Sequence, residues 1–161
     1  MFNIVLVEPE IPQNTGNISR TCACTGSSLH IVKPMMFSID EKHVKRAGLD
    51  YWDKLDLHIH ENLEEFLEYA KGKPMFFAST KSQKTYCDVE FPDGCFIVFG
   101  KETKGLPETL LKDNYEKCIR IPMKEDLRSL NLSNSVAIIL YEALRQHNFE
   151  SLNPFGHLTT E

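Results

Sequence analysis

Four hydroxyl and amide side chains lie close together near the end of the sequence: Asn131, Ser133, Asn134 and Ser135. Their oxygens can accept hydrogen bonds from the unpaired N–H groups of a helix start. Apolar residues then recur at helical spacing and predict a helix through residue 144 with one buried face: Leu132, Val136, Ile139, Leu140, Ala143 and Leu144. A polar start on an anchored helix is suited to hold a polar ligand.

A second group of polar residues lies between residues 12 and 20, where the pattern predicts a loop that enters a helix at residue 17. Arg20 then lies on the first turns of that helix, where its guanidinium can grip a phosphate. The alternative interpretation is a helix cap followed by a surface arginine without a ligand.

A third loop, residues 100–107, follows the apolar run 95–99 directly and carries Lys101 and Lys104. It superficially resembles a phosphate-binding loop, but it has neither the Walker spacing nor the three-glycine dinucleotide fingerprint. Gly100 after a buried strand would instead let a flat ligand approach the backbone.

The rest of the sequence predicts the elements that position these loops. Apolar and β-branched runs predict strands at residues 2–7, 29–32, 57–60, 75–78, 95–99 and 118–121, and helical spacing predicts helices at 17–25, 40–47, 63–70, 107–111 and 132–144. This alternation implies a parallel α/β sheet flanked by helices, with ligands at the carboxyl ends of the strands. The loops 8–17, 100–107 and 122–131 occupy such ends, so we expect the site where they meet. His58 and His60 alternate with apolar residues, which predicts that they face outward.

Composition limits the classes of function. The 161 residues fit one domain, with about the last ten as a loose tail, and no apolar run approaches the roughly 20 residues of a membrane span. The N-terminus has the pattern of a first strand and not of a signal peptide, so we expect a cytoplasmic protein. A net charge of −5 and a pI near 5.7 argue mildly against nucleic acid as a partner. However, Lys42, Lys45 and Arg46 cluster in one segment and can form a basic face.

The cysteines are odd in number and include no Cys-x-x-Cys pair: Cys22, Cys24, Cys87, Cys95 and Cys118. Neither a disulfide framework nor a zinc site is indicated, so we expect reduced, mostly packed thiols and no metal.

Together the three loops resemble the SPOUT (α/β-knot) class of RNA 2′-O-methyltransferases. The shared motifs are Asn-Thr-Gly-Asn-Ile-Ser-Arg at 14–20, Phe-Gly-Lys-Glu-Thr-Lys-Gly-Leu-Pro at 99–107, and Ile-Pro-Met at 121–123 followed by Ser-Leu-Asn-Leu-Ser-Asn-Ser at 129–135. Their order and spacing match over nearly the whole chain. Residues 8–17 and 46–51, and the absence of an added RNA-binding domain, look like the small members that methylate the wobble nucleotide of tRNA.

This resemblance implies a deep C-terminal trefoil knot, which connection rules alone would have excluded. It implies that S-adenosylmethionine (AdoMet) binds in the knot and leaves as S-adenosylhomocysteine. It also implies tRNA as the substrate and no metal. The implied cofactor-binding residues are Ala78, Ser79, Gly100, Glu102, Ile121, Ser129 and Leu130.

The resemblance assigns catalysis to Arg20 with Asn14, Ser129 and Asn131. Arg20 is either the base for the 2′-hydroxyl proton, acting with an RNA phosphate, or a charged donor that grips a phosphate and orients the hydroxyl. The second role fits the fact that a guanidinium is almost never deprotonated.

The resemblance also implies a homodimer that pairs across the helices of the first and third motifs, and Tyr141 lies off the apolar stripe of the last helix. The expected RNA-facing charges are Arg20, Lys42, Lys45, Arg46 and Lys104. Three alternatives remain: methylation of another tRNA or rRNA site, a non-catalytic knotted RNA-binding factor, and an α/β protein that binds a small molecule.

Overall fold

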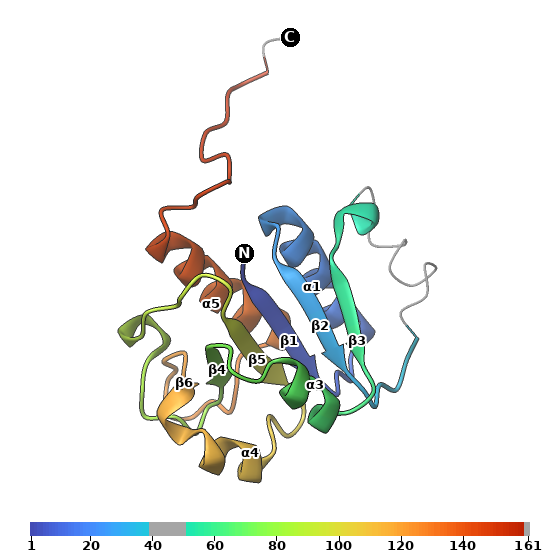
Figure 1. Cartoon of the computed structure of the whole chain (residues 1–161). Helices are drawn as coiled ribbons and strands as arrows, with labels where there is room; N and C mark the ends of the chain where they lie inside the picture. Colours follow the sequence, from blue (N-terminus) through green and yellow to red (C-terminus); the bar gives the residue numbers. More distant parts are fainter. Residues whose placement is uncertain (39–50, 160–161) are drawn as a thin grey trace.

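The protein is built on a single six-stranded parallel sheet with the strand order β3-β2-β1-β5-β4-β6 (Figure 1). We describe it from a computed structural model that covers residues 1–38 and 51–159. Apolar, β-branched runs form the central strands, which are almost entirely buried. The strands are β1 Asn3–Val7, β2 Ser28–Val32, β3 Leu57–His60, β4 Met75–Ala78, β5 Phe96–Gly100 and β6 Cys118–Ile119. The predicted parallel α/β fold is therefore confirmed.

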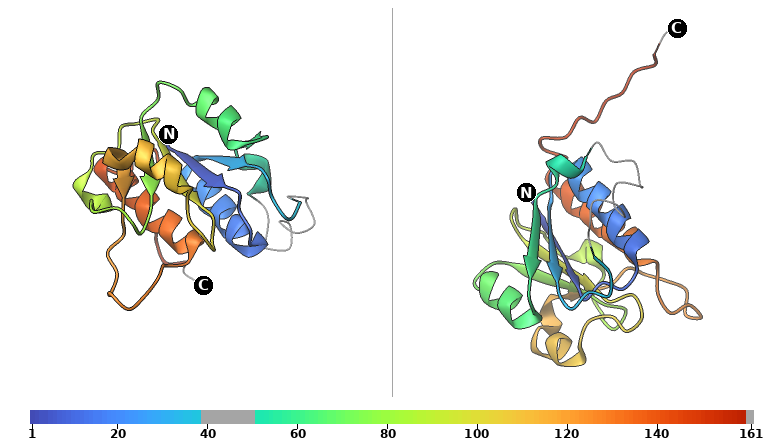
Figure 2. Two further views of the ribbon diagram at one scale, coloured as in Figure 1. Left: turned by 90° about the horizontal axis from the view of Figure 1, so that it is seen from below. Right: turned by 90° about the vertical axis from the view of Figure 1, so that its right-hand side faces the viewer.

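Helices cover both faces of the sheet, as the right-hand view of Figure 2 shows. The long helices α1 (Pro12–Thr25) and α5 (Leu132–Gln146) lie side by side on one face, and the short helices α3 (Leu63–Tyr69) and α4 (Glu108–Asp113) lie on the other. Three single 3-10 turns complete the described elements: η1 Trp52–Lys54, η2 Tyr86–Asp88 and η3 Tyr115–Lys117. The predicted helix at 40–47 lies outside the described residues.

The core has one layer on each face of the sheet. Ile18 and Cys22 of α1 pack with the apolar stripe of α5, including Ile139 and Leu140, against β1, β2 and β5. On the other face, Phe66 of α3 and residues of α4 cover β4 and β5. Burial of these stripes anchors α1 and α5, which carry the polar residues of the first and third sequence motifs.

The last strand is tied closely to the segment that follows β4. Ser79 N–H donates to Ile119 O at 2.9 Å, Arg120 N–H donates to Lys84 O at 2.8 Å, and Tyr86 N–H donates to Arg120 O at 2.9 Å. Residues 79–86 thus form backbone hydrogen bonds with the end of β6, just before the chain continues as the long connection to α5 (orange in Figure 2). This arrangement suits the knotted topology of the resemblance, and the knot itself stays a prediction.

The largest difference from the predicted elements is the start of α1. The sequence predicted a loop through residue 16, whereas α1 begins at Pro12 and contains Asn14 and Gly16. Proline is well accepted in the first turn of a helix because its missing N–H has no partner there in any case. A Cβ added at Gly16 would meet nothing within 4 Å, so this glycine does not mark a turn. The last predicted strand was also too long, since β6 ends at Ile119 and not at residue 121.

The prediction that His58 and His60 face outward is wrong for His60, which is only 5% exposed, whereas Ile59 is 43% exposed. The parallel register places His30 beside His58, and their rings stack with centroids 4.5 Å apart. His30 Nδ1 lies 3.0 Å from His60 Nε2, and its Nε2 lies 3.2 Å from Asn3 Oδ1. The aromatic rings of α3 cover this cluster. Alternation in the sequence places His60 on the solvent side of its strand, but α3 packs over that side and buries it.

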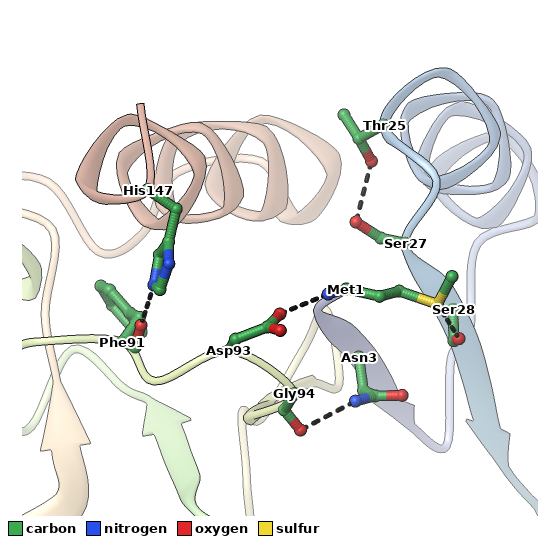
Figure 3. Close-up of polar contacts among 9 residues, drawn as sticks. All are labelled: Met1, Asn3, Thr25, Ser27, Ser28, Phe91, Asp93, Gly94 and His147. Carbon is green, nitrogen blue, oxygen red and sulfur yellow. Dashed lines mark hydrogen bonds and ion pairs between the residues drawn. The ribbon is translucent and has the colours of Figure 1, made fainter. Parts of the chain in front are cut away.

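The amino ends of the strands form the edge of the sheet opposite the loops of interest. There the Met1 amino group pairs with Asp93, and Asn3 Nδ2 donates to Gly94 O at 3.0 Å (Figure 3). His147 at the end of α5 contacts Phe91 O at 2.6 Å. These contacts fix the start of β1 and the end of α5, while residues 153–159 extend away from the sheet (Figure 1).

Three of the thiols are packed, since Cys22, Cys95 and Cys118 are buried while Cys24 and Cys87 are exposed. Burial raises the pKa of Cys22 and of Cys95 to about 12, so neither thiol is reactive at neutral pH. Among the described residues, no helix has the length and apolarity to cross a membrane.

Candidate active site

A pocket of about 410 Å³ opens at the carboxyl ends of β5, β4 and β6 and beside the start of α1. The three loops singled out in the sequence meet there, because parallel strands end at one edge of the sheet. The start of α1, the loop 100–106, and the connection from β6 to α5 all contribute to its wall, and residues 78–81 after β4 complete it. The volume lies within the roughly 300–1,000 Å³ of ordinary ligand sites.

The pocket gathers most of the residues expected to take part in binding or catalysis. Its lining includes Asn14, Ala78, Ser79, Gly100, Glu102, Lys104, Ile121, Ser129, Leu130 and Asn131. Arg20 is absent from it, and Lys42, Lys45 and Arg46 lie outside the described residues. The structure therefore brings together the implied cofactor-binding set but separates it from the arginine assigned to catalysis.

Gly100 ends β5 with a backbone conformation that side chains rarely adopt, φ +126°. A Cβ at this position would lie 2.4 Å from the carbonyl oxygen of Val7, its partner on β1. We expected glycine here to leave room for a ligand. The close approach of β1 gives a separate reason for glycine, because the space that a side chain would need is already taken by the β1 backbone, and the contact with a ligand stays a prediction.

Asn131 joins the third motif to the first. As the N-cap of α5, its Oδ1 accepts from Asn134 N–H at 3.2 Å and from Ser133 Oγ at 2.6 Å, which fixes the orientation of the amide. Its Nδ2 then donates to Oδ1 of Asn14 at 3.1 Å. Because Asn14 uses its oxygen in this bond, it presents its NH₂ as the donor group at the pocket wall.

Glu102 makes hydrogen bonds that the sequence did not predict. Its Oε2 accepts from Glu10 N–H at 2.9 Å and its Oε1 accepts from Ile11 N–H at 3.0 Å. Both oxygens are therefore already bound to backbone just before α1. Glu102 lines the pocket, but its charge is directed to the start of a helix and not to the cavity.

Positive charges surround the pocket, and sequence reasoning found only part of them. Lys101 pairs with Glu8 at 3.0 Å and Lys81 pairs with Glu108. Lys104 and Arg128 have no acidic partner among residues 1–38 and 51–159. Arg128 was missed because it lies in a loop without helical or strand pattern, and its adjacency to the third motif was the available signal. Two unpaired cations at a pocket mouth are suited to hold a phosphate.

Arg20 lies on the outward side of α1. Its neighbour there is Tyr51, whose hydroxyl donates to Gly16 O at 3.4 Å. Burial raises the pKa of Tyr51, and the nearby charge of Arg20 opposes that shift. Tyr141 of α5 belongs to the same helical layer and is 45% exposed. The outer surface of α1 and α5 thus carries both Arg20, the candidate for catalysis, and the exposed ring of Tyr141.

The pocket contains few groups that could accept a proton at neutral pH. Glu102 is the only carboxylate among its described lining residues, none of which is His, Asp or Cys. No group of His, Cys, Asp and Glu in the described part of the chain is placed to hold a metal ion. The pocket offers hydrogen-bond donors, cations and apolar walls, which serve to bind and orient a ligand.

Comparison with known proteins places these features in a family context. Residues 1–141 match the model of the SpoU rRNA Methylase family. A relative from Methylovorus glucosotrophus, named tRNA (cytidine(34)-2′-O)-methyltransferase, is 50% identical over 92% of this chain and 97% of its own length.

Solved structures agree with the sequence relatives. A crystal structure of a Bacillus anthracis protein aligns with a TM-score of 0.90 and 44% identity, covering 95% of this chain and 98% of that one. A second structure, described as giving structural insights into the 2-OH methylation of C/U34 on tRNA, aligns with a TM-score of 0.85 and 40% identity. It covers 92% of this chain and 91% of the other.

Proposed function

The chain belongs to the SpoU rRNA methylase family, and from this premise we propose that it transfers a methyl group from AdoMet to tRNA. The acceptor is the ribose 2′-hydroxyl of the wobble nucleotide at position 34, a cytidine or modified uridine. The observation that carries the proposal is that residues of all three motifs line the same pocket, with Asn14 joined to Asn131 at its wall. The same substrate is supported by the relative named tRNA (cytidine(34)-2′-O)-methyltransferase, which is 50% identical over 92% of this chain. It is also supported by the solved structure described for 2-OH methylation of C/U34 on tRNA, which is 40% identical.

AdoMet fits the chemistry of the pocket. Apolar side chains such as Leu130 and Ile121 suit its adenine ring, and the hydroxyls of Ser79 and Ser129 suit its polar groups. AdoMet supplies a methyl group on a positively charged sulfur, which needs no metal to become electrophilic. Residues 78–79, 100–106 and 128–131 would hold it, and their backbone comes from the ends of two strands, β4 and β5, and from the segment that leads into α5.

The protein's own task is to place the 2′-oxygen in line with the methyl group and to dispose of its proton. A new O–CH₃ bond forms as the S–CH₃ bond breaks, and the hydroxyl proton must leave. The lining offers no free base among the described residues, so the proton passes to an RNA phosphate or to water. Arg20 holds that phosphate and orients the hydroxyl, which requires charge and a fork of donors but no deprotonation of the guanidinium.

A homodimer completes the site. Arg20 lies outside the pocket of its own chain, and a second copy would bring it to the pocket. The exposed apolar residues Ile138 (37%) and Tyr141 (45%) on α5 suit such a pairing surface. The RNA-facing charge comes from Lys104 and Arg128 at the mouth and from the segment with Lys42, Lys45 and Arg46. The enzyme acts in the cytoplasm, where its tRNA substrate is found, and its C-terminal segment is knotted.

Mapping of ribose methylation in RNA from cells with and without this protein tests the proposal. We expect one 2′-O-methyl group to disappear from position 34 of a subset of tRNAs. Loss of a methyl group from ribosomal RNA, with tRNA unchanged, would leave the chemistry standing and refute the substrate. Unchanged ribose methylation in both RNAs would support a non-catalytic RNA-binding factor instead.

A further inference from the structure

The start of α1 lacks a cap of its own. Its N-cap residue is Ile11, which has no side-chain oxygen, and its first turn contains no acidic residue. The free N–H groups at a helix start need acceptors, and a negative charge is favoured there. Glu102 brings a negative charge there from a loop 91 residues away along the chain, by accepting from the N–H of the N-cap residue Ile11 and from the N–H of Glu10 just before it. The helix start is therefore held from outside.

The contact is reciprocal. Glu10 Oε1 accepts from the backbone N–H of Thr103 at 3.1 Å and from Thr103 Oγ1 at 2.8 Å. The side-chain and backbone bonds from Thr103 lower the pKa of Glu10, so this carboxylate is charged at neutral pH. We call the paired contacts of Glu10, Ile11, Glu102 and Thr103 the carboxylate clasp. Each loop donates backbone N–H groups to a carboxylate of the other.

The clasp connects two parts of the site. On one side it grips loop 101–105, which is closed by mutual backbone hydrogen bonds of 3.0 and 2.9 Å between Lys101 and Gly105 and which forms a wall of the pocket. On the other side it grips the residues that immediately precede α1. That helix carries Asn14 one turn later and Arg20 further along, so a shift of the loop is passed to both.

We propose that Glu102 is a positioning residue: through the carboxylate clasp it sets the start of α1, and with it Asn14, relative to the pocket wall of the same chain, and it also sets the helix that presents Arg20 to the pocket of the second copy. Glu102 therefore acts on the rate of methyl transfer and not on the affinity for the methyl donor. Each oxygen of Glu102 accepts a backbone N–H group from the residues just before α1, so the position of the carboxylate and the start of the helix are fixed together. This inference rests on the proposed function for its kinetic test only.

The first test is kinetic and uses Glu102→Gln, which keeps the size of the side chain but replaces one accepting oxygen by an NH₂ group that faces a backbone donor. A displacement of about 1 Å in a catalytic group can cost roughly 100-fold in rate, so we expect kcat for tRNA methylation to fall about 10- to 100-fold. The KM for AdoMet and the Kd for S-adenosylhomocysteine should stay within about 3-fold, as for a group without cofactor contact. Glu64→Gln makes the same chemical change on the exposed face of α3 and is the matched control.

A weakened Kd for S-adenosylhomocysteine, with kcat restored at saturating AdoMet, would overturn the proposal in favour of cofactor binding. A fall in thermal stability with normal kcat at lower temperature would overturn it in favour of a purely structural role. On the other half of the clasp, Thr103→Val should lower kcat because it removes the hydroxyl donor to Glu10, and Thr103→Ser should restore most of the loss.

A second test does not need activity. Amide hydrogen exchange should show that S-adenosylhomocysteine slows exchange at residues 10–16 in the wild-type protein, and that this effect disappears in Glu102→Gln although the ligand still binds. Equal protection of residues 10–16 in the variant would refute the coupling. If the wild-type protein binds the ligand but methylates no RNA, the proposed function fails, while the exchange result still decides on the clasp.

Discussion

Gly100→Ala should destabilise the fold more than alanine at any other glycine in residues 1–38 and 51–159. The new Cβ would lie 2.4 Å from the Val7 carbonyl oxygen, 3.0 Å from its nitrogen and 3.2 Å from its carbonyl carbon. All three are backbone atoms of the neighbouring central strand, so no side-chain rotation can relieve the overlap. The backbone must also keep φ near +126°, which is unfavourable for alanine.

The two effects can be added to give an order of magnitude. A strained backbone conformation costs about 1–3 kcal/mol, and forced overpacking costs about as much again, which gives a loss of roughly 2–6 kcal/mol in the free energy of unfolding. For a chain of this size each kcal/mol lowers Tm by about 2–4 °C, so Gly100→Ala should lower Tm by roughly 4–24 °C.

Gly72→Ala is the matched control, since Gly72 also has a positive φ of +81° but an added Cβ there would meet nothing within 4 Å. It should lose only about 1 kcal/mol, or about 2–4 °C in Tm. Thermal unfolding followed by circular dichroism compares the two variants. Equal Tm values would refute the clash with β1. A Gly100→Ala protein of normal stability that no longer binds S-adenosylhomocysteine would instead show that glycine is needed to leave room for the ligand.

Three further predictions concern the histidine cluster, the catalytic candidate and the pairing surface. Burial, followed by the charges of the neighbouring histidines, lowers the pKa of His30 to about 3, below its unfolded value near 6.5. The folded state then binds fewer protons than the unfolded state, so stability should be complete above pH 6.5 and should fall on acidification by about 1.4 kcal/mol per pH unit for this group. His30→Gln should reduce the slope of the unfolding free energy between pH 6 and pH 4 by about one proton, and an unchanged slope in urea titrations would contradict the assignment. Arg20→Ala should abolish tRNA methylation while calorimetry still detects S-adenosylhomocysteine binding, and near wild-type turnover would remove Arg20 from the mechanism. Tyr141→Glu should convert the dimer to an 18.5 kDa monomer in light scattering, whereas a wild-type protein that is already monomeric at micromolar concentration would refute the pairing.

Much of the fold could be predicted because local pattern and tertiary structure agree. The central strands are uninterrupted apolar runs, and the stripe of α5 has strict helical spacing, so burial alone identifies them. The meeting of the three loops followed from the parallel order of the strands. The start of α1 could not be predicted in this way. Pro12 and Gly16 suggest a loop, and the sequence does not reveal that Glu102, far along the chain, accepts a hydrogen bond from Ile11 at the helix start.

The remaining errors have the same origin in long-range contacts. His60 alternates like an exposed residue, but α3 packs over it and buries it. Gly100 was singled out because glycine leaves room for a ligand, and nothing in the sequence indicated the second constraint, the backbone of Val7 on the adjacent strand. Glu102 belongs to a recognisable motif, yet only its hydrogen bonds to Glu10 and Ile11 reveal that its charge points away from the cavity.

The central claim is that the acceptor atom is the 2′-oxygen of the wobble nucleotide. The most direct measurement is transfer of a labelled methyl group from AdoMet to two synthetic tRNAs that differ only at position 34, where one carries a ribose and the other a 2′-deoxyribose. We expect the ribose form to be methylated once and the 2′-deoxy form not at all, although both bind with similar affinity because the phosphate contacts are unchanged. Continued methylation of the 2′-deoxy tRNA would contradict the account, since the methyl group would then be going to another atom.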